Sequence, residues 1–333
     1  MTRKLATLTV VMPNYNHAHF LPQSLEAILS QSFPPSEVIV IDDASTDNSI
    51  EVIQHYAKKH PAIRLVCNER NMGPAFTYSR GLKLAKCDYI YSASADDTVL
   101  PGFFEKCVRL LERYPQAGLC SSISVVVDGE KRYEVPSPPY VTKVPSYLKP
   151  KEVLNCYVNK DWFIMGNTTI YRKSALNEKT FPDGIGRFND EFTILMISLY
   201  YGACFVPESL SVYNIRSNSY SANSELELLS QRRKAETLMA TTHSEYFPSD
   251  FVKYFAKSNT YLEATYTLKN IDKATNEYLE TINSFLRLHK VSTLLVPVII
   301  KKLVFAHKII IKSILYFRLG RFSLFRVVRF LFY

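Results

Sequence analysis

The sequence lacks the glycine-rich loops that mark two large classes of nucleotide-binding proteins. Only 10 of its 333 residues are glycine. No Gly-x-Gly-x-x-Gly follows the first apolar segment, and no Gly-Lys-Ser or Gly-Lys-Thr occurs in the chain. The first pattern binds the pyrophosphate of dinucleotides, and the second surrounds the phosphates of ATP or GTP. A dinucleotide-dependent oxidoreductase and a P-loop NTPase are therefore both disfavoured.

The sequence also lacks closely spaced cysteines and the pattern of an N-terminal signal peptide. The six cysteines are scattered without a Cys-x-x-Cys or a dense framework, a usage that fits a reducing compartment in which each cysteine acts as a small apolar residue. Residues 1–7 are too short and polar for a signal peptide, so we expect a reduced, cytoplasmic protein. His17-x-His19 has metal-ligand spacing without a third ligand nearby, and exposed loop imidazoles are favoured over a metal site.

Acidic residues are absent after Glu280. Ten of the 40 basic residues follow that position, so the rest of the chain has 30 basic and 31 acidic residues. A charge surplus confined to the tail calls for a local explanation. Nucleic-acid binding is disfavoured, because the body is nearly neutral and the basic tail is rich in Leu, Ile, Val and Phe.

The tail, residues 291–333, also lacks an uninterrupted apolar run. A membrane span needs about 20 apolar residues, and lysines interrupt every such window. On a helical wheel the lysines oppose apolar residues: Lys301, Lys308 and Lys312 against Val304, Ile311 and Leu315. This pattern predicts a basic amphipathic helix that lies peripherally on the anionic inner face of the cell membrane. Packing against the body or a second copy is the alternative.

Apolar segments typical of buried strands alternate with helical segments through residue 114. The expected strands are residues 8–12, 38–41, 63–67 and 89–94, and the expected helices are residues 20–31, 45–59, 73–85 and 101–114. This order predicts an α/β fold with a mostly parallel sheet flanked by helices. Asn48 and Glu51 have capping-box spacing, and Pro101 is expected to begin the last of these helices.

The second half of the chain is less regular. We expect strands at 119–127, 161–171, 203–206 and 210–215, a hairpin turn at Asp128-Gly129, an irregular segment at 136–150 and a helix at 194–201. Residues 225–289 are amphipathic and helical in pattern. The predicted domains are therefore an α/β domain at 1–222, a helical extension at 223–290 and the membrane-associating tail at 291–333.

Paired carboxylates follow two of the predicted strands. Asp42-Asp43 and Asp96-Asp97 both stand where a strand gives way to a helix. The carboxyl ends of parallel strands share one edge of a sheet, so we expect all four carboxylates to converge there. Such a cluster needs a cation, and oxygen ligands suit Mg²⁺ or Mn²⁺. The alternative is that Asp96 caps the next helix and Asp97 is solvated.

The motifs in this order resemble the family 2 inverting glycosyltransferases, which have the GT-A fold. The similar stretch covers roughly the first 220 residues. Its motifs are VVMPNYN at 10–16, VIVIDDASTDNS at 38–49, Asn71-x-Gly73 through Gly81-Leu82, DYIYSASADD at 88–97, and Asp190-Glu191-Phe192 with Gly202 beyond. The resemblance implies a Rossmann-like, mostly parallel sheet with a helical C-terminal extension.

The resemblance also implies roles for residues of the first four motifs. Pro13 and Tyr15 would line the nucleobase pocket, with Tyr15 stacking on the base. Asp43 would hydrogen-bond the base or the ribose. Asp96 and Asp97 would hold a Mn²⁺ or Mg²⁺ ion that bridges the donor diphosphate.

Glu191 would be the general base, with Asp190 as the alternative, because the family's motif is Glu-Asp and this chain has Asp-Glu. Both acids head an apolar helix, whose N-terminus is expected to favour the ionised form. Arg216 is a candidate diphosphate ligand, with a surface ion pair as its alternative. Three departures from the family pattern stand out: Ser94 for a common Asp, Tyr78-Ser79 for Arg-Asn, and Cys87 for Gly.

The implied function is a metal-dependent inverting transfer of a sugar from a nucleotide donor, UDP-linked by expectation, to a hydroxyl. Lipid-linked saccharides held at the membrane are the expected acceptors, as in surface polysaccharide synthesis. A nucleotidyltransferase is one alternative, although its usual glycine-rich phosphate loop is missing. A non-catalytic membrane-bound scaffold that retains the fold is the other.

Overall fold

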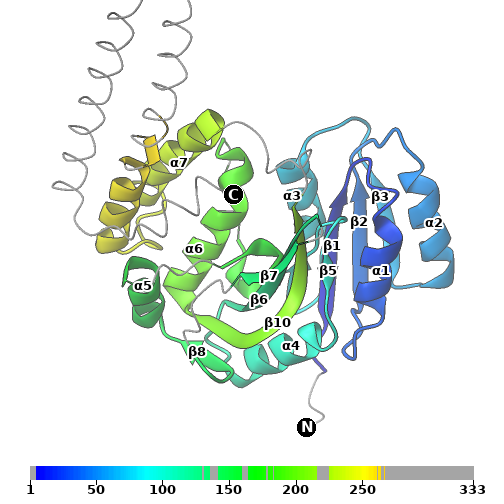
Figure 1. The fold of residues 1–333 in the computed structure, drawn as a ribbon, viewed down its shortest axis with the longest axis horizontal. Coiled ribbons are helices and arrows are strands. Elements are labelled where there is room, and N and C mark those ends of the chain that lie inside the picture. The colour runs from blue at the N-terminus through cyan, green and yellow to red at the C-terminus, as the bar shows by residue number, and fades with distance from the viewer. Residues whose placement is uncertain are drawn as a thin grey trace, which may run out of the picture. The chain divides into compact units, whose positions relative to one another are not determined.

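Figure 1 shows the computed structural model of the chain as a ribbon. The structure describes residues 5–129, 131–135, 142–159, 164–177, 179–182, 184–215, 225–260, 262–263 and 266. They fall into two compact units. The sheet unit lies within Met1–Asn223 and Thr237–Phe251, and the helical unit within Ser224–Glu236 and Val252–Tyr333. Residues 237–251, which we assigned to the helical extension, thus cluster with the sheet unit.

The first half of the sheet unit is parallel, as the alternating pattern predicts. Strands β1 (Leu8–Asn14), β2 (Glu37–Asp42), β3 (Ile63–Cys67) and β4 (Tyr89–Ser92) lie in the order β3-β2-β1-β4. Helices α1 (Leu21–Leu29), α2 (Ser49–Lys59) and α3 (Pro74–Leu84) connect them. Side chains alternate across a strand, so Val10 packs on the face with α1 and α2, and Val11 on the face with α3.

The second half of the sheet is mixed in direction. It contains β5 (Thr98–Val99), β6 (Leu119–Asp128), β7 (Lys131–Val135), β8 (Ser146–Leu148), β9 (Thr169–Arg172) and β10 (Ala203–Ile215). From β4 the sheet continues β9-β6-β10-β5, and β9 runs antiparallel to both of its neighbours. Helices α4 (Phe103–Arg113), α5 (Pro150–Asn159) and α6 (Asn189–Tyr201) and the short 3-10 turn η1 (Gly166–Thr168) complete this half. The α/β fold class is confirmed, and the purely parallel order is limited to the first half.

Several boundaries differ from those expected. Helix α4 begins at Phe103, because Gly102 (φ 85°) has a left-handed backbone that separates Pro101 from the helix. The capping box at Asn48 is wrong: Asn48 makes no side-chain cap, and the Asp47 carboxylate accepts the Ser49 N–H instead.

Longer segments differ as well. The two strands expected near residues 203–215 are one strand, β10, with irregular register around Ser209. The described part of 161–171 becomes a strand only at Thr169. Strand β8 forms inside the segment that we expected to be irregular. The β6–β7 hairpin across Gly129 is as predicted.

The helical unit contains the first part of α7 (Glu225–Ala240) and the helical residues 252–260. Arg232 joins them, since its Nε donates to Asn259 Oδ1 (2.9 Å) and its guanidinium lies 4.4 Å from the ring centroid of Phe255. In the part of the chain described here, no helix is long and apolar enough to cross a membrane. The predicted amphipathic tail, residues 291–333, lies outside the described residues.

Gly202 ends α6, and we expect its replacement by alanine to be strongly destabilising. Its φ is 76°, and an added Cβ would collide with the Leu148 carbonyl oxygen and the Tyr147 ring. Strain in the left-handed region and overpacking together should lower the free energy of unfolding by about 2–5 kcal/mol. Gly102→Ala is the matched control at about 1–2 kcal/mol, because only the flexible end of Lys106 lies near its added Cβ. Urea unfolding of both variants measures the difference, and equal losses would contradict the collision.

Candidate functional site

The carboxyl ends of β1 and β2 are joined by a buried hydrogen-bond network. Asn14 and Asp42 are paired in the ladder, and the Asn14 amide donates to Asp42 Oδ2 (2.8 Å). Asp42 also accepts the Ser45 N–H (2.9 Å) and the Ser45 hydroxyl (2.6 Å). Asp42 is fully buried. The expectation that all four carboxylates converge on one crevice is therefore wrong for Asp42, which shapes the loop after β2.

Asn16 links the loop after β1 to the loop after β2 through hydrogen bonds. Its backbone has a positive φ of 55°, its N–H donates to Ser45 Oγ (2.9 Å), and its side-chain oxygen accepts the N–H of Thr46 (2.7 Å). The neighbouring Tyr15 is 41% exposed. The predicted base-stacking ring therefore stands at the open edge of the sheet, beside Pro13 at the end of β1. Our sequence analysis missed Asn16 and Ser45, although asparagine tolerates the left-handed region better than most residues.

We expect Asn16→Ala to destabilise the sheet unit by about 2–3 kcal/mol. The substitution removes the acceptor for Thr46 and leaves a Cβ-bearing residue without a polar side chain in the left-handed region. Asn16→Gly separates the two causes, because glycine relieves the backbone strain but cannot accept the hydrogen bond. It should fall between the native protein and Asn16→Ala in thermal unfolding. An unfolding curve of Asn16→Ala that matches the native curve would show that the hydrogen bonds of Asn16 between the two loops do not stabilise the sheet unit.

Asp43 organises the loop in front of α3. Its carboxylate accepts the Asn68 side-chain amide (2.6 Å), the Met72 N–H (2.9 Å) and the Gly73 N–H (2.8 Å), and the residue is 3% exposed. Arg80 in turn donates to the Asn68 side-chain oxygen. Both Asp43 oxygens thus have donors from the protein itself. A direct contact of Asp43 with a base or ribose stays a prediction, and its observed partners hold Met72 at the surface.

Asp96 and Asp97 lie in the turn between β4 and β5 and are held by Asn214 of β10. The Asn214 N–H donates to Asp97 Oδ1 (3.0 Å), and the Asn214 side-chain amide donates to the Asp96 carbonyl (2.7 Å). Asp97 is 5% exposed and Asp96 is half-buried. Sequence reasoning missed Asn214, because no local pattern connects residues more than 100 positions apart.

The side chains of Asp96 and Asp97 are suitable ligands for a divalent cation. Carboxylate oxygens are the preferred protein ligands of Mg²⁺ and also suit Mn²⁺. Within the described ranges, no group of three His, Cys, Asp or Glu side chains could hold a metal ion. Two adjacent carboxylates therefore fit an ion whose remaining ligands come from water or from a substrate diphosphate, as is usual for Mg²⁺.

The acidic pair Asp190-Glu191 stands in the first turn of α6, as predicted. Asp190 lies beside η1, because its Oδ2 is 3.8 Å from the position of a Cβ at Gly166. Water reaches the Asp190 side chain, but surrounding protein desolvates the carboxyl and raises its pKa to about 6. This direction is opposite to the one expected from the helix N-terminus. Glu191 is half-buried.

Two buried tyrosines lie on the Asp190 side of the sheet unit. Burial raises the pKa of Tyr78 on α3 and of Tyr171 on β9, and the nearby Asp190 charge raises both further. Tyr78 is one of the departures from the family pattern, and its ring packs edge-on against Phe181, with centroids 5.3 Å apart. Arg216, the predicted diphosphate ligand, lies outside the described residues.

The sequence matches the family profile described as Glycosyl transferase family 2 over residues 9–179, about half of the chain. It is 27% identical over 225 residues to the glycosyltransferase GlyG of Streptococcus pneumoniae serotype 4, over 64% of this chain and 72% of GlyG. Several other curated glycosyltransferases are matched over only 30–42% of their own length.

The solved structures that share the fold include a TarS fragment and a mannosyltransferase. Residues 1–349 of S. aureus TarS in complex with UDP-GlcNAc give a TM-score of 0.59 at 18% identity, over 71% of this chain and 67% of that one. Mannosyltransferase PcManGT from Pyrobaculum calidifontis, in complex with GDP-Man and Mn²⁺, gives 0.54 at 21% identity, over 77% and 70%. The GT-A architecture expected from the sequence motifs is thereby confirmed.

Proposed function

The chain belongs to glycosyl transferase family 2, and we propose that it transfers a sugar from a nucleotide diphosphate donor to an acceptor hydroxyl with inversion. The observation that carries this proposal is the Asp96-Asp97 pair, which Asn214 holds between β4 and β5. The pair follows β4, which lies next to β1 and parallel to it, so both strands end at the same edge as the exposed Tyr15. Open α/β sheets bind ligands at that edge.

The donor is a nucleotide sugar, and we propose a UDP-sugar. TarS was solved with UDP-GlcNAc and PcManGT with GDP-Man. In this chain Tyr15 offers an exposed ring for base stacking, and Asp43 holds the neighbouring loop through the N–H groups of Met72 and Gly73. Aromatic stacking tolerates any base, so the choice of uracil rests on the resemblance of the motifs.

Asp96 and Asp97 would hold Mn²⁺ or Mg²⁺, which when bound offsets the charge that develops on the leaving diphosphate. The acceptor oxygen forms a bond to the anomeric carbon, while the bond from that carbon to the diphosphate breaks. A carboxylate of the Asp190-Glu191 pair takes the hydroxyl proton, and we assign this role to Glu191. The raised pKa of Asp190 also suits a base near neutral pH, so Asp190 is the alternative.

The acceptor is proposed to be a lipid-linked saccharide at the cytoplasmic face of the membrane. Support comes from the basic, apolar composition of residues 291–333, which would hold the enzyme near such a substrate. The competing functions are a nucleotidyltransferase and a non-catalytic scaffold. Nucleotide binding tests the scaffold, and the product that is released distinguishes the two enzymes.

Nucleotide binding can be tested by thermal shift with UDP and GDP, each with and without Mn²⁺. We expect UDP to raise the melting temperature only when Mn²⁺ is present, since the metal would bridge Asp96 and Asp97 to the diphosphate. The shift should be several degrees, because a ligand at 100 times its Kd adds about 2.7 kcal/mol. No shift with any nucleotide diphosphate would favour the scaffold. Incubation with UDP-sugars then separates the two enzymes, since glycosyl transfer releases UDP and nucleotidyl transfer releases pyrophosphate.

A further inference from the structure

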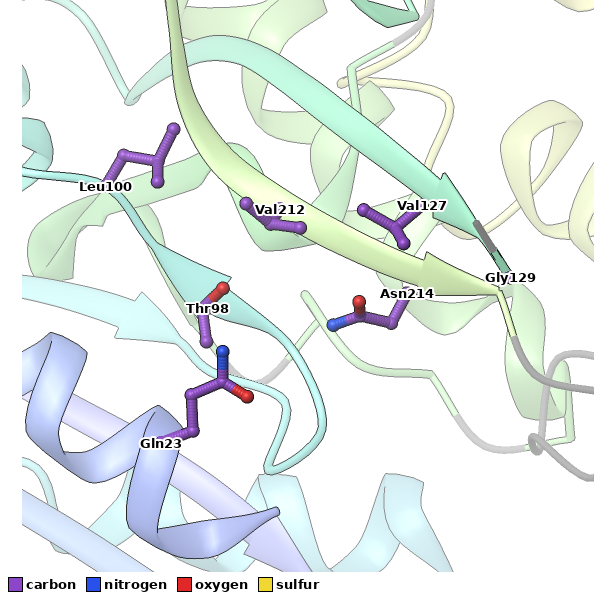
Figure 2. Close-up of a pocket in the computed structure, with 7 residues that line it drawn as sticks. All are labelled: Gln23, Thr98, Leu100, Val127, Gly129, Val212 and Asn214. Atoms are coloured by element: carbon purple, nitrogen blue, oxygen red, sulfur yellow. The ribbon is translucent and has the colours of Figure 1, made fainter. Parts of the chain in front are cut away.

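A cavity of about 370 Å³ lies in the sheet unit (Figure 2). It borders the Asp96-Asp97 pair, because Asn214 lines it and donates hydrogen bonds to both aspartates. Helix α1, strand β5 with the residue that follows it, the β6–β7 hairpin and β10 all contribute to its wall. The lining residues are Gln23, Thr98, Leu100, Val127, Gly129, Val212 and Asn214. Its size is within the range of about 300–1,000 Å³ that is usual for small-molecule sites.

The lining combines polar, uncharged groups with aliphatic surface. In Figure 2 the Gln23 side chain extends from α1 toward Thr98 of β5, and the Asn214 side chain extends from β10 toward the space between these elements, with Val127 and Val212 nearby. None of the seven lining side chains carries a formal charge. A charged ligand would be desolvated there without a counter-charge from the lining. A saccharide ring offers hydroxyls for the amides and C–H surface for the valines, so a neutral sugar fits this lining.

Asn214 connects the cavity to the proposed catalytic edge. The same residue that lines the cavity donates its backbone N–H to Asp97 Oδ1 and its side-chain amide to the Asp96 carbonyl. The side-chain oxygen of Asn214 is an additional acceptor for a ligand hydroxyl. A ligand in the cavity would therefore be separated from the two aspartates by Asn214.

We propose that this cavity is a subsite for a neutral saccharide unit of the acceptor, a proposal that rests on the function proposed above. The unit bound there is remote from the reacting hydroxyl. Binding energy from remote parts of a substrate orients the reacting group and raises the rate of transfer. The donor sugar is tied to the diphosphate, which Asp96 and Asp97 would hold through the metal, so a separate cavity walled by β10 would serve the acceptor.

Gln23→Trp tests this subsite. Gln23 is exposed on α1, so the larger side chain can fill the cavity without disturbing the core. Saturation-transfer NMR would measure binding of methyl glycosides of glucose, galactose, mannose and N-acetylglucosamine to the full chain saturated with UDP and Mg²⁺. We expect at least one glycoside to bind the native protein, and Gln23→Trp to weaken it at least tenfold. Gln54→Trp, the same change at an exposed position of α2, should bind it as the native protein does.

Three outcomes would overturn the proposal. The first is that no glycoside binds the UDP-saturated native protein, and the second is that Gln23→Trp binds as tightly as Gln54→Trp. The third is that replacing the saturating UDP by UDP-glucose displaces the glycoside, which would assign the cavity to the donor sugar. UDP binding with Mg²⁺ is measured on all three proteins. If the native protein does not bind UDP, the proposed function is refuted. If it binds UDP but no glycoside, only the subsite is refuted.

Discussion

Asp97→Asn should lower kcat/KM for sugar transfer at least about a hundredfold to a thousandfold and leave the fold intact. The asparagine retains an Oδ1 that can accept the Asn214 N–H, so the contact between the β4–β5 turn and β10 persists. The substitution replaces the second carboxylate oxygen by an amide and removes the charge that a divalent cation requires. Release of UDP from a UDP-sugar at saturating Mn²⁺ measures the change.

The control for this prediction is Asp250→Asn, the same change at an exposed position of the sheet unit. Both variants should unfold within a few degrees of the native protein. The Mn²⁺-dependent thermal shift with UDP should disappear in Asp97→Asn and persist in Asp250→Asn. Turnover by Asp97→Asn within threefold of the native rate would remove Asp97 from the metal site.

Glu191→Gln should lower kcat by about 10²–10⁴-fold, which is the usual contribution of a general base. UDP binding should be retained, because the substitution acts on the acceptor side of the reaction. Glu51→Gln is the matched control, since Glu51 also stands in the first turn of a helix, α2, and is exposed. A silent Glu191→Gln together with an inactive Asp190→Asn would move the role of base to Asp190.

The pH dependence separates the same two assignments. A base must be ionised, and the pKa of Asp190 is raised to about 6 by desolvation. If Asp190 is the base, kcat/KM should fall tenfold for each pH unit below about 6. Stability gives an independent measure: the folded pKa of Asp190 exceeds its ordinary value of 3.8, so the native protein loses stability as the pH rises from about 4 through 6. Asp190→Asn should lack this loss in melting curves taken at pH 5 and pH 8.

The sequence alone determined the parallel half of the fold and which polar side chains stand at its edge. Continuous apolar segments such as residues 38–41 can be buried only between two covered faces, so β1 to β4 were found within two residues of their observed ends. The positions of Tyr15, Asp97 and Glu191 at the ends of strands or in the first turn of a helix followed from the same pattern. Strands with weaker patterns, such as β8, and the antiparallel insertion of β9 were not found, since their partners are distant in sequence.

Tertiary structure decided which protein groups surround each of the acidic side chains. Asp42 and Asp43 are adjacent and chemically identical, yet their hydrogen-bond partners differ. Asp42 accepts hydrogen bonds from Asn14 and Ser45, and Asp43 accepts them from Asn68 and from the loop before α3. The half-buried Asp96 and its neighbour Asp97 are positioned by Asn214, a strand residue that no local motif identifies. A carboxylate's role depends on the donors that surround it, and those donors come from segments that only the folded chain brings together.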